Sequence, residues 1–415
     1  MNDKFTVNSI FSEYGNSYIS SSGNFISFEQ NKVIKSLTYC RSGALGYRIQ
    51  KCDCCGNETV LNNSCRNRHC PQCQNLKREK WLLNRKIELL PCRYFHIIFT
   101  LPHSLNNLVF NNQFELYSLF FKTASDTLKI FAANRLHLGA DIGFLMVLHT
   151  WGQQLSFHPH IHCLVSAGGL SENKEKWITS RKDDFLFCVK KLSKAFSKNF
   201  CDALERRTND KKLKPLFFND DYSKNNFPKF INDLKYLKWV IYCRAPLTED
   251  YSVIDYLGRY AYRVAIANSR IINIENGFIH FKYKDYRDNK EKILSLETFE
   301  FMRRFLLHVL PDRFRKIRYY GILGNNQKMK IIPLCRKLLE KEFDSALSIF
   351  DHISVQHNPL ETAFSFFKQN LEFNKCEHCK IGKLFTLAIY LPYRYGYRKI
   401  IKNRQTKKRT QKRGP

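Results

Sequence analysis

Short apolar runs alternate along the chain with longer segments of helical periodicity. Residues 94–101 (YFHIIFTL) and 160–167 (HIHCLVSA) are rich in aromatic or branched side chains and are followed by Pro or Gly, so they are predicted to be strands. Residues 238–246 (KWVIYCRAP) are a third strand candidate. Helical spacing of Phe and Leu predicts a helix over 108–136, and residues 187–215 are typical of a helix followed by a charged loop. This alternation predicts an α+β or α/β core.

Composition divides the chain into three regions, which we expect to be three domains. Residues 1–93 hold a cysteine cluster, residues 94–330 mix strands and helices, and residues 331–415 are predicted to be helical with a basic tail. No acidic residue follows Glu377, and the last stretch (RKIIKNRQTKKRTQKRGP) is typical of a disordered arm that is attracted to phosphates.

Three histidines occupy alternate positions in the second predicted strand. Side chains of a strand alternate between its two faces, so His158, His160 and His162 are predicted to point the same way. Because Pro159 cannot donate to a strand ladder, we expect the strand to begin near His160. His160 and His162 then flank Ile161, which points into the core. These two imidazoles either hold a divalent ion that polarises a phosphate or lie on a solvated strand face.

A predicted helix over 251–270 carries two tyrosines beside an apolar stripe. Aliphatic side chains at intervals of 3, 4 and 3 form that stripe: Ile254, Leu257, Ala261 and Val264. Tyr256 and Tyr260 share a face at its edge, and Arg259 and Arg263 extend the same side towards solvent. An aromatic pair at this spacing is commonly core packing. Here the aliphatic residues already supply the stripe, which leaves the tyrosines available to line a cleft.

Histidine-bound metal and tyrosine together have a specific chemical meaning in a basic protein. Free tyrosine has a pKa of about 10 and is a weak nucleophile at neutral pH. A metal ion beside it would polarise a scissile phosphate. Attack by tyrosine on phosphorus would leave a 5′-phosphotyrosine and a free 3′-OH, and this covalent bond conserves the energy needed to rejoin the strand.

The charge balance predicts a polyanionic partner. The chain has 415 residues, 68 of them Lys or Arg and 37 Asp or Glu, for a net charge of +31. Such an excess indicates nucleic acid or an anionic membrane surface. The longest apolar runs, such as GFLMVL and LFTLAIYL, are far below the ~18 residues that span a bilayer, and the start (MNDKFTVNSI) does not resemble a signal peptide. We therefore expect a soluble, cytoplasmic, nucleoid-associated protein with DNA as its partner and no membrane.

The cysteines indicate zinc. In a reducing compartment, clustered cysteines among the 15 in the chain are more typical of metal sites than of disulfides. The best quartet consists of two C-x-x-C knuckles that together complete a tetrahedron: Cys52, Cys55, Cys70 and Cys73. Cys54, Cys65 or His69 is an alternative ligand or joins a second ion. Cys376 and Cys379 are either half of a second zinc knuckle with partners elsewhere or unrelated to metal.

Basic and aromatic residues interleave in residues 278–292 and 313–321. This mixture suits stacking on unpaired bases along a charged groove. Lys282, Lys284 and Arg287, together with Arg259 and Arg263, are the candidate DNA contacts. For any single residue among them, the alternative is an ordinary strand with lysines on its solvated face.

Several motifs resemble one family over most of residues 50–380. HPHIHCLV with HTWGQ before it, YLGRYAYRVAIAN after it, and SCRNRHCPQCQ, YFHIIFTLPH and CEHCKIG elsewhere resemble the HUH-type rolling-circle insertion-sequence transposases that have paired tyrosines and an N-terminal zinc-binding domain. The resemblance implies an α+β fold with an HUH endonuclease core, an antiparallel sheet with flanking helices. It also implies cleavage of single-stranded DNA at the ends of the element.

The resemblance also implies roles for individual residues. His160 and His162 would be the metal pair, and Tyr256 and Tyr260 the nucleophiles for donor and target strands. The third metal ligand is open between His149 and Gln153, on the preceding strand of a hairpin, with His158 next. The family implies Mg²⁺ or Mn²⁺, while imidazole ligands favour Mn²⁺ or Zn²⁺.

Three other functions remain possible on this sequence. A relaxase or replication-initiation nuclease would share the chemistry, but the zinc domain and the missing helicase argue against it. A zinc-dependent DNA-binding protein would have no catalysis, and a hydrolase of a small phosphoester is hard to reconcile with the net charge of +31. No G-x-x-x-x-G-K signature occurs, so unwinding would come from host replication or helicase machinery.

Overall fold

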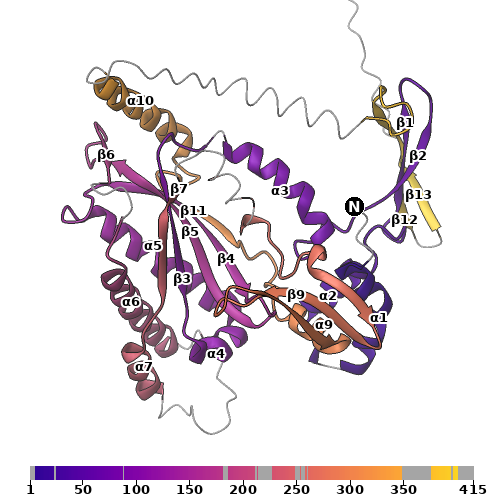
Figure 1. Ribbon diagram of the computed structural model, residues 1–415, viewed down its shortest axis with the longest axis horizontal. Coiled ribbons are helices and arrows are strands. Elements are labelled where there is room, and N and C mark those ends of the chain that lie inside the picture. Colours follow the sequence, from indigo (N-terminus) through magenta and orange to yellow (C-terminus); the bar gives the residue numbers. More distant parts are fainter. Residues whose placement is uncertain are drawn as a thin grey trace, which may run out of the picture. The chain divides into compact units, whose positions relative to one another are not determined.

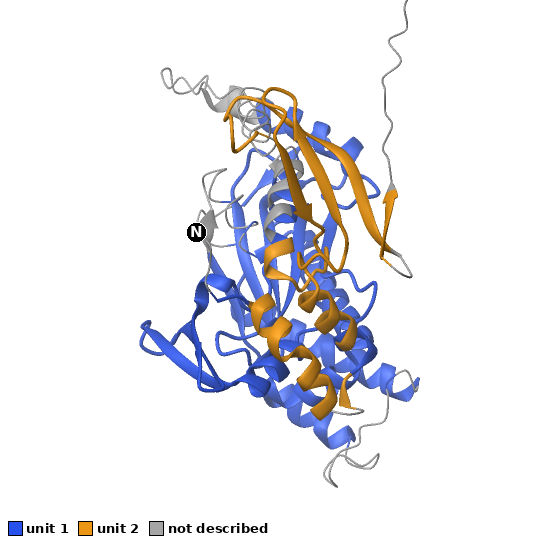
Figure 2. Cartoon of the chain, turned by 90° about the vertical axis from the view of Figure 1, so that its right-hand side faces the viewer, with its two compact units in different colours: residues 1–6, 27–30, 74–353 blue, residues 7–26, 31–73, 354–415 orange. Residues whose placement is uncertain are grey.

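The computed structural model describes residues 5–22, 25–86, 88–180, 186–210, 213, 227–247, 253, 258, 260–347, 375–393 and 396–400. The chain forms two compact units, each assembled from separated stretches (Figure 2). The first unit contains residues 1–6, 27–30 and 74–353, and the second contains residues 7–26, 31–73 and 354–415.

An antiparallel sheet in the order β11-β4-β5-β3-β7 is the centre of the first unit, and β6 pairs with β5 (Figure 1). Its strands are β3 (Tyr94–Thr100), β4 (Asp141–Trp151), β5 (Phe157–Leu170), β6 (Trp177–Thr179), β7 (Ile241–Leu247) and β11 (Ile317–Gly321). The sequence predicted strands over most of β3, β5 and β7, and the antiparallel sheet with flanking helices is confirmed.

Helices pack against this sheet through one large apolar core. They are α4 (Asn106–Asn111), α5 (Gln113–Ala133), α6 (Val189–Asn209) and α7 (Phe227–Tyr236). The alternation of β5 is visible in its packing, because Ile161, Cys163 and Val165 belong to this core whereas Leu164 packs in a separate apolar cluster. That second cluster also contains Leu82 of α3 and, partly buried, Tyr260. His160 and His162 share the face of Leu164 by the same period of two.

A second antiparallel sheet in the first unit has the order β10-β9-β8. It consists of β8 (Ile271–Glu275), β9 (Phe278–Lys284) and β10 (Glu291–Glu297), and α9 (Thr298–Leu306) follows directly. The described part of this unit also contains the 3-10 helices His103–Leu105 and Asn268–Arg270 and α10 (Lys328–Leu347).

The second unit combines helices with a four-stranded sheet of order β13-β12-β1-β2. Its elements are α1 (Val7–Ser22), β1 (Tyr47–Cys52), β2 (Glu58–Asn62), β12 (Leu384–Tyr393) and β13 (Gly396–Ile400). Helices α2 (Phe28–Thr38) and α3 (Pro71–Lys86) each belong partly to this unit and partly to the first. The C-terminal segment, expected to be helical, therefore also supplies two strands: β12 pairs with β1, more than 300 residues earlier, and β13 pairs with β12. Residues 398–400 of the basic tail, expected to belong to a disordered arm, lie in β13 because they pair with β12, and the rest of the tail lies outside the described residues.

Two local predictions differ from the structure. Strand β5 begins at Phe157, before Pro159, because Phe157 pairs with Trp151 across a β-bulge and so extends the β4–β5 ladder. The helix predicted over 251–270 ends at Ala261 in the described residues. Val264, Ala265 and Ile266 are all buried, and three consecutive buried residues cannot share one face of a helix.

Among the described residues, no helix combines the length and apolarity that crossing a bilayer requires.

Candidate metal centre and nucleophile

Three histidines from two neighbouring strands converge in the central sheet. His149 of β4 lies directly opposite His160 of β5, and His162 follows on the same face of β5. One ring nitrogen from each lies within 4.8 Å of the others, so the three can bind one ion. His149 and His162 are buried, and His160 is partly exposed. The structure therefore brings together three of the residues that the sequence nominated for a metal.

Hydrogen bonds fix the orientation of each imidazole. His160 donates from Nδ1 to the carbonyl of His158 at 2.7 Å, and His149 donates from Nε2 to the carbonyl of Tyr260 at 2.7 Å. A carbonyl only accepts, so the other ring nitrogen of each histidine carries a lone pair. Nδ1 of His162 lies 3.0 Å from Nε2 of His96, which leaves Nε2 of His162 as the nitrogen free to bind a metal. Such outer partners are typical of metal-binding histidines.

Burial keeps these imidazoles neutral. Loss of solvation lowers the pKa of His160 to about 4 and the pKa values of His149 and His162 well below their ordinary value. The positive charge of Arg263 lowers all three pKa values further. Metals bind the neutral imidazole, so the cluster is in the protonation state that an ion requires.

His158 and Gln153 lie outside this group. The His158 ring is next to the rings of His160 and His103, with centroids 5.3 and 5.1 Å apart, so it continues the row of histidines on β5. Gln153 lies in the turn between β4 and β5, where its Nε2 donates to the hydroxyl of Tyr286 at 2.9 Å. Of the three candidates for a third ligand, His149 is the one whose ring joins the pair.

Tyr260 packs on the cluster. Its ring centroid lies 4.2 Å from that of His162 and 5.7 Å from that of His96, and its carbonyl accepts the bond from His149. Tyr256 and Arg259 lie outside the described residues. Gly258 packs closely on α3, because a Cβ there would lie 2.9 Å from Leu82 Cδ1. The segment that carries Tyr260 is thus held between α3 and the sheet.

His96 of β3 is a site residue that the sequence analysis did not single out. It is 1% exposed and shares the face of the histidine cluster. Burial lowers its pKa to about 3. Within the apolar run YFHIIFTL, this histidine had no feature that distinguished it from a core residue. The signal that could have identified it is that its strand, β3, neighbours β5, which carries the three histidines.

The candidate DNA contacts differ in exposure and in the ion pairs that they form within the protein. Arg263 and Lys284 are exposed. Lys282 forms an ion pair with Glu291 at 2.8 Å. Arg287 is paired with Asp285.

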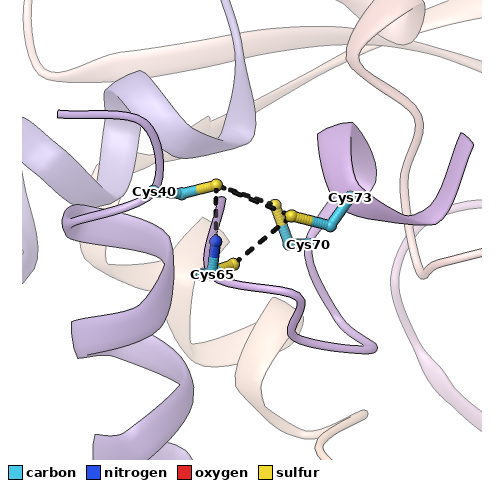
Figure 3. A group of neighbouring side chains, drawn as sticks. All are labelled: Cys40, Cys65, Cys70 and Cys73. Atoms are coloured by element: carbon cyan, nitrogen blue, oxygen red, sulfur yellow. Dashed lines mark hydrogen bonds between the residues drawn. The ribbon is translucent and has the colours of Figure 1, made fainter. Parts of the chain in front are cut away.

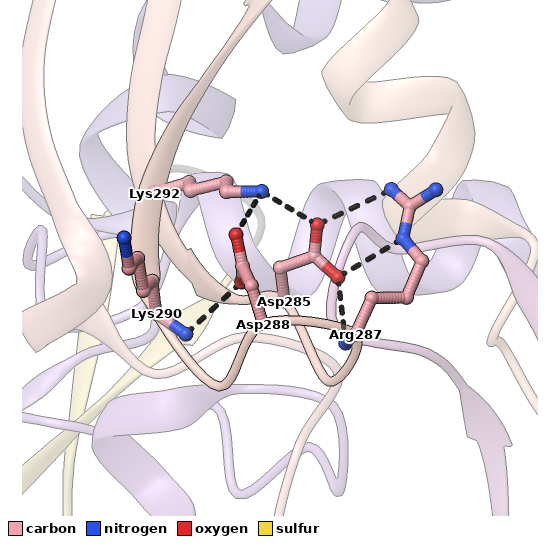
Figure 4. A network of polar contacts seen from close by, with 5 residues as sticks. All are labelled: Asp285, Arg287, Asp288, Lys290 and Lys292. Atoms are coloured by element: carbon pink, nitrogen blue, oxygen red, sulfur yellow. Dashed lines mark hydrogen bonds and ion pairs between the residues drawn. The ribbon is translucent and has the colours of Figure 1, made fainter.

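Figure 4 shows Asp285 held between Arg287 and Lys292, at 3.2 and 2.8 Å, with Asp288 also paired to Lys292 at 2.7 Å. The bonds from Arg287 and then Lys292 hold the pKa of Asp285 below its ordinary value. This network fixes the β9–β10 loop, so Arg287 has a structural partner besides any phosphate.

The cysteines form two quartets rather than the predicted one. Cys70 and Cys73, at the start of α3, join Cys40 and Cys65, whereas Cys52 and Cys55 join Cys376 and Cys379. The predicted combination of the two knuckles is therefore split. Of the predicted alternative ligands, Cys65 belongs to a quartet, and Cys54 and His69 belong to neither. The C-x-x-C spacing marked the pairs correctly, but spacing alone does not reveal which pairs meet.

Figure 3 shows the first quartet, which we call the Cys40 quartet. Sulfur–sulfur distances are 3.7 Å for Cys40–Cys73, 3.6 Å for Cys65–Cys73 and 3.8 Å for Cys40–Cys70. A tetrahedral ion with Zn–S bonds of about 2.3 Å keeps its sulfurs about 3.8 Å apart. Asn8 of α1 supports the quartet, with its Nδ2 3.5 Å from the Cys70 sulfur and 3.1 Å from the Leu37 carbonyl. The geometry fits zinc.

A cavity of about 1350 Å³ lies elsewhere in the first unit. Its lining includes Asp141, Lys129 and Tyr320, from the start of β4, α5 and β11. His149 lies eight residues further along β4, which is about 26 Å in a strand. The cavity is therefore separate from the histidine cluster.

Two family models match the chain. One, for a transposase zinc-binding domain, matches residues 10–101, and the other, described as "Putative transposase", matches residues 143–330. The protein "Putative transposase y4qJ" of Sinorhizobium fredii (strain NBRC 101917 / NGR234) is 42% identical over 389 residues, which cover 92% of this chain and 95% of that protein. The chain belongs to the IS91-type transposase family.

The transposase is also similar to the "Transposase for insertion sequence element IS801" of Pseudomonas savastanoi pv. phaseolicola. The two are 28% identical over 370 residues, which cover 88% of this chain and 85% of that protein. No solved structure matches. Members of this family are HUH rolling-circle transposases, so the resemblance seen in the sequence is confirmed, and the function of the transposase is DNA transposition.

Proposed function

We propose that the transposase nicks and rejoins single-stranded DNA at the ends of its insertion sequence through a 5′-phosphotyrosine intermediate. The observation that carries this proposal is the Tyr260 ring, 4.2 Å from the ring of His162 in the three-histidine cluster. A phenol beside a metal-binding cluster, in a chain of net charge +31, suits attack on a DNA phosphate.

The histidine cluster fits a divalent ion. The donor set consists of three neutral imidazoles, those of His149, His160 and His162. In each ring one nitrogen makes a hydrogen bond that fixes the ring, and the other nitrogen can bind the ion. Imidazole donors suit Mn²⁺ or Zn²⁺ better than Mg²⁺, and the family favours Mg²⁺ or Mn²⁺, so Mn²⁺ satisfies both criteria. When bound, such an ion would polarise the scissile phosphate and stabilise the charge on its oxygens.

Tyr260 is the proposed nucleophile. Its phenol oxygen attacks the phosphorus and loses its proton, the bond from phosphorus to the 3′ oxygen breaks, and that oxygen takes up a proton to become a free 3′-OH. The segment downstream of the nick remains bound to the tyrosine through its 5′-phosphate. Reversal of the step by another 3′-OH joins the strands without a nucleotide cofactor. Tyr256, outside the described residues, is proposed as the second nucleophile.

The surrounding charges support a DNA path. Arg263 is exposed and close enough to the three histidines to lower their pKa values. Lys284 is exposed on β9. We propose both as phosphate contacts, with Arg259 and, after exchange of their acidic partners, Lys282 and Arg287. Zinc in the Cys40 quartet is proposed to be structural, and host machinery is proposed to supply unwound strands.

The test is capture of the covalent intermediate. Purified transposase and Mn²⁺ are incubated with single-stranded oligonucleotides that cover the DNA flanking its own gene, and denaturant-resistant protein–DNA adducts are measured. We expect an adduct that His160→Ala abolishes and that Tyr260→Phe or Tyr256→Phe reduces or abolishes. Tyr236→Phe is the matched control, because Tyr236 is exposed at the end of α7.

Other outcomes support other functions. Cleavage without an adduct would indicate a hydrolytic nuclease. Binding without cleavage, unaffected by His160→Ala, would indicate a zinc-dependent DNA-binding protein.

A further inference from the structure

Four cysteines meet in the second unit at a place that the zinc-domain match covers only in part. Cys52 is the last residue of β1, Cys55 lies in the turn that follows, and Cys376 and Cys379 precede β12. The match ends at residue 101, so it includes the first pair and not the second. Cys55 and Cys376 are 321 positions apart in sequence, yet their sulfurs are 3.7 Å apart.

The sulfur positions fit a tetrahedral ion. Cys52 and Cys379 are also separated by 3.7 Å between sulfurs, and all four sulfurs lie within 4.8 Å of one another. A disulfide requires about 2.0 Å, whereas a tetrahedron with Zn–S bonds of about 2.3 Å requires about 3.8 Å. The sulfur–sulfur distances in this group match the value for a tetrahedral zinc site.

Backbone hydrogen bonds hold the two cysteine knuckles opposite each other. Strand β1 pairs with β12 as far as Cys52 and Leu384, at the edge of the site. Beyond that pair, Asp53 donates from its backbone N–H to the Lys383 carbonyl at 3.0 Å, and Lys383 donates to Asp53 Oδ1 at 2.6 Å. Within the second knuckle, Cys376 donates to the Gly382 carbonyl at 2.7 Å. The site is therefore built by the sheet itself.

Two further contacts are typical of thiolate ligands. The backbone N–H of Cys54 donates to the Cys52 sulfur at 3.4 Å, and that of Gly382 donates to the Cys379 sulfur at 3.2 Å. A Cβ at Gly382 would lie 2.3 Å from the Cys52 sulfur, so only glycine lets the knuckles approach this closely.

We propose that Cys52, Cys55, Cys376 and Cys379 form a second zinc site, independent of the Cys40 quartet, that closes the sheet β13-β12-β1-β2. Four sulfur ligands leave no open position, so the role of this zinc is structural. It joins two segments that are distant in sequence, and the docking on β1 of β12, which carries β13 on its other edge, depends on it. This site goes beyond the nicking chemistry proposed above and does not depend on it.

The zinc content of the full-length chain tests the site. Measurements are made in the His160→Ala background, so that zinc at the histidine cluster is not counted. We expect two zinc ions per chain in this parent, and one after Cys376→Ser with Cys379→Ser. Cys54→Ser is the matched control, because Cys54 lies between two of the ligands but outside both quartets, and it should retain two. An unchanged zinc content in the double variant would overturn the proposal.

A second measurement decides the case in which the double variant loses both ions through misfolding. Cys379→His preserves four ligands but replaces one sulfur by nitrogen. With Co²⁺ in place of zinc, we expect it to bind two ions with weaker thiolate-to-cobalt absorption than the parent. The same absorption as in the parent would show that Cys379 is not a ligand and would overturn the site.

Discussion

His96 Nε2 lies 3.0 Å from His162 Nδ1 across neighbouring strands of the central sheet. Because burial lowers the pKa of His96 to about 3, its ring stays neutral and can accept a hydrogen bond from His162. That bond fixes the tautomer of His162 and leaves its Nε2 for a metal. His96 is therefore a positioning residue for the proposed site.

Removal of the acceptor at position 96 should weaken metal binding. We expect His96→Leu to raise the Kd for Mn²⁺ by about 10- to 100-fold, because outer partners of metal-binding histidines have effects of that size. His96→Gln, which retains an acceptor, should restore most of the affinity. Calorimetric titration with Mn²⁺ measures both. His280→Leu, at a partly exposed histidine on β9, is the control, and equal affinity in all four proteins would contradict the role of His96.

Asn8 should stabilise zinc in the Cys40 quartet. Its amide lies near the Cys70 sulfur and also holds the end of α2 through the Leu37 carbonyl. We expect Asn8→Ala to release zinc to a coloured chelator about 10-fold faster than the parent. Asn111→Ala, within α4 of the other unit, should leave the rate unchanged. A parent-like rate in Asn8→Ala would show that this contact does not support the ion.

His308 should make the stability of the first unit pH-dependent. It is 1% exposed, bonded to Thr150 and to the Leu155 carbonyl, and burial lowers its pKa to about 4. The unfolded chain, with a His pKa of about 6.5, binds more protons than the folded chain between these values. The contribution is thus complete above pH about 6.5 and is lost as the pH falls towards 4. One buried group with this shift contributes on the order of 3 kcal/mol.

Urea unfolding between pH 7 and pH 4 measures this contribution. We expect His308→Gln to flatten the fall in unfolding free energy relative to the parent. Other buried histidines contribute to the same fall, so the comparison between the two proteins is the observable. Parallel curves would rule out His308 as a source.

Lys284 should contact DNA phosphate, whereas Lys122 should not. Each phosphate contact on a single strand contributes about 0.7 to the slope of log affinity against log salt. We expect Lys284→Gln to reduce the slope by about that amount and to weaken binding of all sequences alike. Lys122→Gln is the control, because Lys122 is exposed on α5 and paired with Asp126 at 2.6 Å. Fluorescence anisotropy over a salt series gives the slopes, and an unchanged slope for Lys284→Gln removes it from the DNA path.

Local patterns predicted much of the central sheet. The alternation of His160, Ile161 and His162 gave the correct faces, because a strand has a period of two whatever it pairs with. The hairpin partner His149 followed from chain order. Where the prediction differed, tertiary contacts decided the outcome: pairing with Trp151 extended β5 past Pro159, and burial of residues 264–266 ended the helix early.

Local sequence patterns could not predict which residues distant in sequence lie close together in the fold. Cys40 carries no C-x-x-C signature, and nothing local marks it as the partner of Cys70. Cys376 and Cys379 indicated two ligands of a tetrahedral site. The other two, Cys52 and Cys55, lie in a segment that is brought near only by the pairing of β1 with β12. His96 is similar, since a histidine in an apolar strand has no visible function until its neighbour is known.

The strand order of the second unit also has a consequence for synthesis on the ribosome. Strand β1 is paired on one side by β2, which follows it at once, and on the other by β12, which is made more than 300 residues later. During translation that second edge has no partner while the whole histidine cluster is completed, and unpaired strand edges are prone to wrong association. The sheet whose first strands are synthesised earliest is therefore completed only when the C-terminal strands have been made.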